Sequence, residues 1–266
     1  MAESVILTYP AGAPLANGQR VVVSSVDLPG FREPVITAVG GLPRLRAGTL
    51  LCNDTDAPLL RIAGGGYFPR GPSEPAARVY FAEALVSGRP PGGADAFKIV
   101  RRGVSLAWIT LSDKGFAGLR GDESGPLIAR IASEYLPIGH AQGFLLPDDA
   151  LALRALLTDL ALIQGYDLIV TTGGTGLAPS DRTPEATLAV IDKRLPGFET
   201  AMTHASLAKT PMAAISRAVC GTLGDSLILN LPGSPKAVRE NFAAVGPALE
   251  HALQKLQGDP ADCARI

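Results

Sequence analysis

The sequence has little cysteine, few aromatic residues and almost no net charge. Its three cysteines, Cys52, Cys220 and Cys263, lie far apart, with no C-x-x-C pair and no histidine at metal-ligand spacing. This spacing argues against a disulfide framework and against a structural zinc site. The formal net charge is -1, so the chain lacks the broad positive field of a non-specific nucleic-acid binder. Any anionic ligand must therefore be held locally.

Long apolar runs are also missing. No stretch reaches the roughly 18 apolar residues of a membrane-spanning helix, and the first residues lack the basic and apolar segments of a signal peptide. We therefore expect no membrane partner, no nucleic-acid partner and a cytoplasmic location. Hydrophobic residues make up 47% of the 266 residues, which is enough for a sizeable core, and the length favours two domains.

Glycine (30 residues) and proline (22) are abundant and are most concentrated in residues 1–98. In this part, short apolar runs alternate with turn residues, which predicts a small β-rich domain. We also expect one helix at 74–86 and a linker at 87–96, SGRPPGGADA. The expected strands lie in the runs 20–25, 34–39, 48–52 and 58–62.

From residue 99 onward, buried apolar runs alternate with helical patterns. This order predicts an α/β domain with a mostly parallel sheet over 99–266. One further helix is expected to open at Pro184, with Thr183 as its N-cap. The remaining expected elements are strands at 104–111, 141–146, 167–172 and 227–231, and helices at 126–136, 150–164 and 235–256.

The segment 171–187, TTGGTGLAPSDRTPEAT, carries the strongest functional signal. It leads from a buried strand through glycines and threonines into a helix, and ligands of open parallel sheets bind beyond the carboxyl ends of strands. A glycine-rich backbone there lets a phosphate approach N–H groups, and the helix N-terminus adds positive partial charge. The pattern is neither a P-loop nor a dinucleotide-binding loop. The alternative is a tight turn that needs glycine for its geometry alone.

Two aspartates, Asp148 and Asp181, follow predicted strands and are expected on the same edge of the sheet. Two carboxylates would repel a phosphate unless they hold Mg²⁺, which proteins bind through one or two carboxylates plus substrate phosphates. The alternatives are that Asp148 caps the helix beginning near residue 150 and that Asp181 forms a turn.

Two further polar segments follow strands at the same edge. The first, 110–125, is a long loop that carries Ser112 and Asp113, and loops of this length are usually functional. The second, 230–235, contains Asn230, which either bonds a ligand or stabilises the turn. Before the last strand, Ser216 and Arg217 either hold a phosphate or form a solvated surface pair.

No nucleophile triad emerges from the histidines or cysteines. His140, His204 and His251 have no motif around them, so we interpret them as structural or surface residues. Cys220 lies near a predicted strand and is interpreted as a small core residue.

Residues 104–256 resemble the MogA/MoaB-type molybdopterin adenylyltransferases of molybdenum cofactor biosynthesis. The resemblance is carried, in this order, by LSDKGFAGLRGDESGP, LLPDD, TTGGTGLAPSDRTPEAT, LPGF, HASLAKTPMAAISR and DSLILNLPGSPKAV. It implies a three-layer α/β/α fold and a homotrimer. It also implies an enzyme that uses Mg²⁺ and ATP to adenylylate molybdopterin on its terminal phosphate, releasing pyrophosphate. The product would pass to a MoeA-type molybdenum insertase.

The resemblance also implies roles for individual residues. Asp148 and Asp181 would be the catalytic and Mg²⁺-associated pair. The residues implied to bind the nucleotide are Gly173, Gly174, Thr175, Gly176, Pro232 and Gly233. The residues implied at the pterin side, or on the pterin and its phosphate, are Ser112, Asp113, Ser206, Ser216 and Arg217.

Residues 1–98 lie outside this resemblance. Some relatives carry a fused MOSC-type domain, and Cys52 is the one cysteine here that could serve as a sulfur carrier, provided that it is exposed and activated. The alternative for Cys52 is a buried thiol at a strand end. For the whole chain, the alternative to an adenylyltransferase is a non-catalytic protein that binds molybdopterin or acts as a scaffold in the same pathway.

Overall fold

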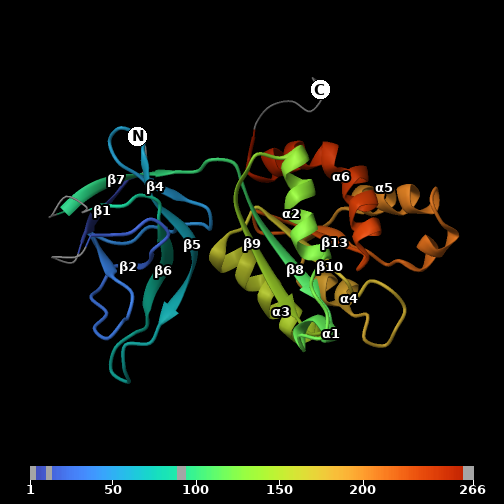
Figure 1. Ribbon diagram of the computed structural model, residues 1–266, viewed down its shortest axis with the longest axis horizontal. Helices are drawn as coiled ribbons and strands as arrows, with labels where there is room; N and C mark the ends of the chain where they lie inside the picture. Colours follow the sequence, from blue (N-terminus) through green and yellow to red (C-terminus); the bar gives the residue numbers. More distant parts are fainter. Residues whose placement is uncertain (1–3, 10–13, 89–93, 260–266) are drawn as a thin grey trace. The chain divides into compact units, whose positions relative to one another are not determined.

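The computed structural model describes residues 4–9, 14–88 and 94–259 (Figure 1). The chain divides into two compact units, residues 1–102 and residues 103–266. Among the described residues, the first unit contains seven strands, and the second contains six strands with helices. No helix within the described ranges is both long enough and apolar enough to cross a membrane.

The first unit is a closed β-barrel, which confirms the expected β-rich domain. Its strands follow one another around the barrel in the order β1, β3, β2, β6, β5, β4, β7, and β7 pairs with β1 to close it. Each of the seven strands therefore pairs with two neighbours. The strands are β1 (Ser4–Thr8), β2 (Arg20–Ser24), β3 (Val35–Val39), β4 (Leu50–Cys52), β5 (Pro58–Phe68), β6 (Ala77–Ala84) and β7 (Ala94–Val100).

The helix expected at 74–86 is wrong, because this segment forms strand β6. Its side chains alternate between buried and more exposed positions, and β6 pairs antiparallel with both β2 and β5. Alanine and glutamate favour a helix in isolation. Here pairing on both edges outweighs that preference, together with burial of Tyr80 in the barrel core and of Val79 in a second cluster with Val22 and Leu28.

The linker expected at 87–96 is also wrong in its described part. Gly88 bridges to Leu15, and strand β7 already begins at Ala94. Residues 89–93 of the expected linker lie outside the described residues. Strand β7 pairs with both β1 and β4, so the glycine- and proline-rich composition precedes a strand on which the closure of the barrel depends.

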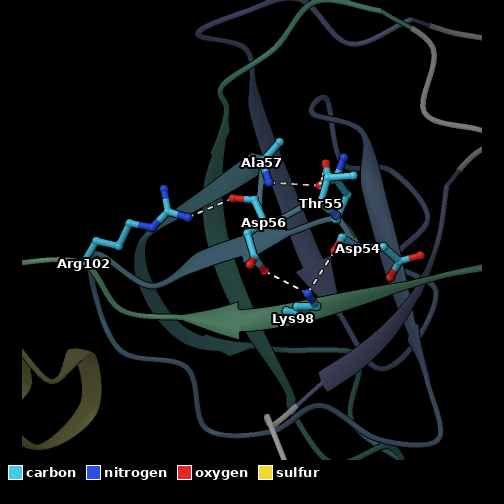
Figure 2. Close-up of polar contacts among 7 residues, drawn as sticks. Asp54, Thr55, Asp56, Ala57, Lys98 and Arg102 are labelled. Atoms are coloured by element: carbon cyan, nitrogen blue, oxygen red, sulfur yellow. Dashed lines mark hydrogen bonds and ion pairs between the residues drawn. The ribbon is translucent and has the colours of Figure 1, made fainter.

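Cys52 is the buried thiol at the end of strand β4, as the second of the two interpretations held. The following turn contains Asp56, a non-glycine residue with φ of 60°. Lys98 Nζ donates to Asp56 Oδ1 at 2.9 Å, and Arg102 Nη2 donates to the Asp56 carbonyl at 2.8 Å (Figure 2). Burial raises the pKa of the Cys52 thiol, although Arg102 and Lys98 act in the opposite direction.

The second unit is an α/β domain built on a six-stranded, mostly parallel sheet. The strand order is β11, β12, β13, β10, β8, β9, with β13, β10, β8 and β9 mutually parallel. Its strands are β8 (Val104–Leu111), β9 (Ile138–Leu146), β10 (Leu168–Thr172), β11 (Lys193–Arg194), β12 (Cys220–Leu223) and β13 (Ser226–Leu231). Its helices are α1 (Asp113–Phe116), α2 (Ser124–Tyr135), α3 (Ala150–Thr158), a π-helix (Asp159–Gln164), α4 (Thr183–Leu188), α5 (Pro196–Leu207), a 3₁₀ helix (Pro211–Ile215) and α6 (Pro235–Leu256).

The sheet lies between two sets of helices, which confirms the three-layer architecture. Helix α6 contacts both α2 and α5, whereas α3 contacts α4 and the π-helix. Leu168 and Val170 of β10 share a core cluster with residues of α2 and α6. Ile169, between them, is fully buried but lies outside that cluster. Because successive strand residues face opposite sides, both faces of β10 are covered.

The expected strands and helices of this unit are confirmed, with two corrections. The helix expected at 150–164 changes to a π-helix after Thr158. The expected N-cap role of Thr183 is wrong, because Thr183 is already helical and Arg182 occupies the cap position. The hydroxyl of Thr183 instead donates to the Gly173 carbonyl at 2.9 Å, so it bonds to the glycine-rich loop rather than to its own helix.

We predict that Cys52 resists alkylation in the folded chain. A thiol that is buried and has a raised pKa stays protonated at about pH 8, and the thiolate is the reacting form. In a Cys263→Ser variant treated with iodoacetamide and analysed by peptide mass spectrometry, Cys52 should be unmodified under native conditions and fully modified in urea. Native alkylation at the rate of a free thiol would contradict this and would restore the sulfur-carrier interpretation.

We also predict that Gly246→Ala destabilises the second unit. An added Cβ at Gly246, on α6, would lie 2.7 Å from ring atoms of Tyr135 on α2. Overpacking costs about 1–3 kcal/mol, more than the gain of up to ~1 kcal/mol from alanine in a helix. The check is urea unfolding followed by the fluorescence of Trp108, the single tryptophan.

The matched control is Gly197→Ala on helix α5, where nothing lies within 4 Å of an added Cβ. This variant should be at least as stable as the wild type. Equal free energies of unfolding for the two alanine variants would show that Tyr135 does not restrict position 246.

Candidate functional site

The carboxyl ends of β8, β9, β10 and β13 meet at one edge of the sheet. In the register, Thr172 lies opposite both Thr110 of β8 and Leu231 of β13. Bonds join the loops that follow: Ser112 N–H donates to the Leu146 carbonyl at 3.0 Å, and the Thr172 hydroxyl donates to the Pro232 carbonyl at 2.8 Å. The parallel order therefore brings the predicted segments 110–125, 171–187 and 230–235, together with Asp148, to the same edge.

A pocket of about 270 Å³ opens at this edge between the loops after β8 and β13 and the ends of β9 and β10. Two of the predicted site residues, Ser112 and Gly233, line it. Ser112 also caps helix α1, because its hydroxyl accepts from the Gly115 N–H at 3.1 Å. Polar residues to which the sequence analysis gave no role line the pocket as well: Thr110, Arg120, Asp122, Glu123, Ser124 and Thr172.

Asp122 organises one wall of this pocket. Its Oδ2 accepts from the Thr110 hydroxyl at 2.7 Å, and its Oδ1 accepts from the Gly125 N–H at the start of α2 at 2.9 Å. The Ser124 hydroxyl donates to the Gly233 carbonyl at 2.9 Å, which joins this wall to the loop after β13. The sequence could have indicated this role, because Asp122 stands three residues before Gly125 at the start of a helix. This is the spacing at which a side chain caps a helix.

The carboxylates of Asp113 and Asp148 lie against each other's backbone. The Asp148 N–H donates to Asp113 Oδ1 at 2.9 Å, and the Asp113 N–H donates to Asp148 Oδ2 at 3.3 Å. Burial raises the pKa of Asp148 above its usual value, and the nearby carboxylates of Asp113 and Asp181 raise it further. The next residue, Asp149, is the N-cap of α3, so capping is the role of Asp149 and not of Asp148.

Asp181 closes the glycine-rich loop by accepting from the Ala178 N–H through Oδ2 at 2.8 Å. Within the described ranges, neither Asp148 nor Asp181 forms an ion pair, and no three acidic, histidine or cysteine side chains form a metal-binding group. Mg²⁺ needs only one or two protein carboxylates when phosphates supply the other oxygens. Two mutually repelling carboxylates without a cationic partner therefore fit a divalent cation.

A wider pocket of about 500 Å³ lies beside Asp148. Its lining includes Arg154 and Arg182, together with Glu185 of helix α4. The pocket therefore combines the Asp148 carboxylate with two arginines, an arrangement that can hold a metal and phosphate oxygens together.

The glycines of the 173–176 loop are required by close packing. Gly173 and Gly174 have φ of 100° and 63°. An added Cβ would lie 2.5 Å from the Leu111 carbonyl oxygen at Gly173 and 2.4 Å from the Thr183 hydroxyl at Gly174. At Gly176 it would lie 2.7 Å from Asp181 Oδ2. At these three positions a side chain would collide with neighbouring atoms. The loop therefore needs glycine for its geometry, as the alternative interpretation held.

The backbone of the same loop still offers an anion site. The Gly173 N–H donates to the Leu231 carbonyl at 3.2 Å. In contrast, the N–H groups of Gly174, Thr175 and Gly176 donate to no acceptor in the part of the chain that the structure describes. Three successive N–H groups without protein acceptors are the donors that a phosphate needs.

Three predicted site residues have other contacts. Ser206, on α5, accepts from Asn241 Nδ2 at 2.9 Å, and the Ser216 N–H donates to the Ala213 carbonyl at 3.0 Å. Neither serine lines the two pockets. The Arg217 side chain bonds to the loop that ends in Asp181.

Asn230 is an internal amide. Its Nδ2 donates to the hydroxyls of Thr171 and Thr187, at 2.9 and 3.0 Å. It therefore joins strand β13 to β10 and helix α4. Cys220 is fully buried in the core of the second unit, as interpreted from the sequence.

Comparison with known proteins places this site in a family. Residues 107–251 match the family described as probable molybdopterin binding domain. Over 143 residues the chain is 40% identical to a molybdopterin adenylyltransferase of Haemophilus influenzae, covering 53% of this chain and 73% of that protein. The crystal structure of the molybdopterin biosynthesis enzyme MoaB from Thermus thermophilus superposes with a TM-score of 0.56 and 46% identity, covering 60% of this chain and 99% of that one.

A longer relative is matched only in part. The molybdenum cofactor synthesis protein cinnamon of Drosophila melanogaster is 36% identical over 162 residues, which cover 61% of this chain and 27% of that protein. The chain therefore spans about a quarter of the length of this relative. The family match begins at residue 107, beyond the barrel. From its sequence match, its sheet and its edge of converging loops, the chain belongs to the family of probable molybdopterin-binding domains.

Proposed function

We propose that the chain is a molybdopterin adenylyltransferase. In this reaction an oxygen of the terminal phosphate of molybdopterin attacks the α-phosphorus of ATP. The bond from that phosphorus to the bridging oxygen of the β-phosphate breaks, and pyrophosphate leaves. The observation that carries the proposal is that three N–H groups without an acceptor among the described residues, at 174–176, lie at the same edge of the sheet as the Asp148 and Asp181 carboxylates.

Such a transfer asks the protein mainly to position the phosphates and to neutralise their charge. Asp148 and Asp181 would hold Mg²⁺, which when bound offsets negative charge on the phosphates. The N–H groups of Gly174, Thr175 and Gly176 would bind nucleotide phosphates, and Gly173 gives the loop its shape. Pro232 and Gly233 would complete the nucleotide pocket.

The pterin side is assigned to the loop after β8. Ser112 and Asp113 would border the pterin there, and Ser112 lines the smaller pocket. Ser206 and Ser216 would approach the pterin and its phosphate only with some movement of the segment between α5 and β12, because neither lines that pocket.

The named relatives support this activity. The Haemophilus influenzae relative is called a molybdopterin adenylyltransferase, and it is matched over 143 residues of this chain. All the proposed reacting groups lie in the domain assigned to 99–266, and the barrel domain of 1–98 supplies none of them. The proposal includes a homotrimer and a MoeA-type molybdenum insertase as the acceptor of the product.

We predict that Asp148→Asn and Asp181→Asn each lower turnover by on the order of 100-fold or more. Each change removes one negative charge from the metal site while keeping the shape of the side chain. The measurement is the release of pyrophosphate from ATP in the presence of molybdopterin and Mg²⁺. Circular dichroism should show that both variants remain folded, because neither side chain lies in the core.

The matched control is Asp149→Asn, at the next position along the chain. Asparagine also caps helices, so this variant should retain turnover within about 2-fold of the wild type. Near-normal turnover of Asp148→Asn or Asp181→Asn would contradict the assigned roles. Tight binding of molybdopterin by the wild type without any release of pyrophosphate would favour the non-catalytic alternative.

A further inference from the structure

The side chain of Arg217 contacts protein acceptors through all three guanidinium nitrogens. Nε donates to the Gly176 carbonyl at 2.9 Å, and Nη2 donates to the Asp181 carbonyl at 2.7 Å. Nη1 forms an ion pair with Glu185 in the first turn of α4. The guanidinium is thus bonded to the loop 176–181 at both ends and to the helix that follows it.

The backbone of the same residue adds a fourth contact. The Arg217 N–H donates to the Thr175 carbonyl at 3.0 Å. Between these attachment points, residues 177–180 are exposed. The loop's own bonds, from the Ala178 N–H to Asp181 Oδ2 and from the Asp181 N–H to the Ala178 carbonyl, tie it only to itself. The contacts with Arg217 are therefore the main connection between the 176–181 loop and the rest of the domain.

We propose that Arg217 is a positioning residue that holds the 176–181 loop, and with it the Asp181 carboxylate, and that it is not a ligand of the substrate phosphate. The inference rests on the proposed function, in which Asp181 holds Mg²⁺. A guanidinium has five N–H donors in a fixed plane, and here each of its nitrogens already faces a protein acceptor. Its charge is matched by Glu185, so a phosphate would meet a neutral ion pair.

The loop needs such a restraint because of the charges that it carries. Asp148 lines the same pocket as Ser180 and Arg182, the residues on either side of Asp181, so the carboxylates of Asp148 and Asp181 lie close enough to repel each other. Without a restraint, an exposed loop would relieve this repulsion by moving Asp181 away and widening the metal site. Arg217 opposes that movement by bonding to backbone carbonyls and not to the Asp181 carboxylate, whose Oδ1 accepts no bond among the described residues and remains available to a metal.

The test compares Arg217→Ala and Arg217→Lys with the wild-type full chain. Lysine keeps the charge but loses the planar fork that reaches three acceptors at once, so it should not rescue the alanine variant. For both variants we expect a lower kcat and a roughly 10-fold higher Mg²⁺ concentration for half-maximal rate, while the KM for molybdopterin stays within about 2-fold, because the restraint acts on the metal site.

Hydrogen exchange provides a readout that does not depend on activity. Within 177–182, the hydrogen-bonded amides of Ala178 and Asp181 should exchange roughly 10-fold faster or more in both variants than in the wild type without ligands, because the loop has lost its restraint. The matched control is Arg194→Ala. Arg194 also bonds to a carboxylate through Nε and Nη2, namely that of Glu199, and its removal should leave the kinetics and the exchange of 177–182 unchanged.

The opposite pattern would overturn the inference. If Arg217→Ala raised the KM for molybdopterin by about 10-fold or more with unchanged Mg²⁺ dependence, and Arg217→Lys restored it, Arg217 would be a phosphate ligand. Unchanged exchange in both variants would likewise exclude the restraint. A wild-type chain without turnover would contradict the proposed function alone, because the exchange rates would still show whether Arg217 holds the loop.

Discussion

Parallel pairing of β8, β9, β10 and β13 fixes where the four loops at the edge of the sheet begin. Thr172 is in register with Thr110 on one side and with Leu231 on the other, so the three loops that follow must start at the same level. A slip of one residue in β10 would turn its side chains to the opposite face. It would also break the bond from the Thr172 hydroxyl to the Pro232 carbonyl. The buried strands thus set the geometry, and the loops supply the chemistry.

At this edge the protein places several carboxylates close together, and among the described residues Asp148 and Asp181 form no ion pair. Burial raises the pKa of Asp148, and the nearby carboxylates of Asp113 and Asp181 raise it further. The half-buried guanidinium of Arg217 is already matched by Glu185. Anions must then be bound by backbone N–H groups, by a metal or by the arginines of the wider pocket. This local solution is why a chain with net charge -1 can have a site suited to polyanions.

Much of the second unit could be predicted from the sequence, because its elements are long and strongly periodic. Helix α6 begins and ends where its apolar spacing indicates, and the continuous apolar run of β8 is a strand buried on both faces. The barrel was predicted less well. Strand β6 has the alanine-rich composition of a helix, and β7 follows a segment with the composition of a linker. Both are strands because of partners far away in the chain, which local composition does not encode.

The location of the site followed from strand order, but its internal contacts did not. A glycine-rich loop predicts both close packing and access for a phosphate. Here the close packing occurs at the positions where side chains would stand, and the N–H groups of the same loop are the donors for a phosphate. The positions where side chains would stand are filled by Leu111, Thr183 and Asp181. The N–H groups of 174–176 have no acceptor among the described residues. Packing on one side of the loop thus holds the N–H groups on the other in place before a ligand arrives, which lowers the entropic cost of binding. The family resemblance implies that Arg217 contacts the substrate. In the proposal made above Arg217 holds the loop instead, and so it also keeps these N–H groups in place.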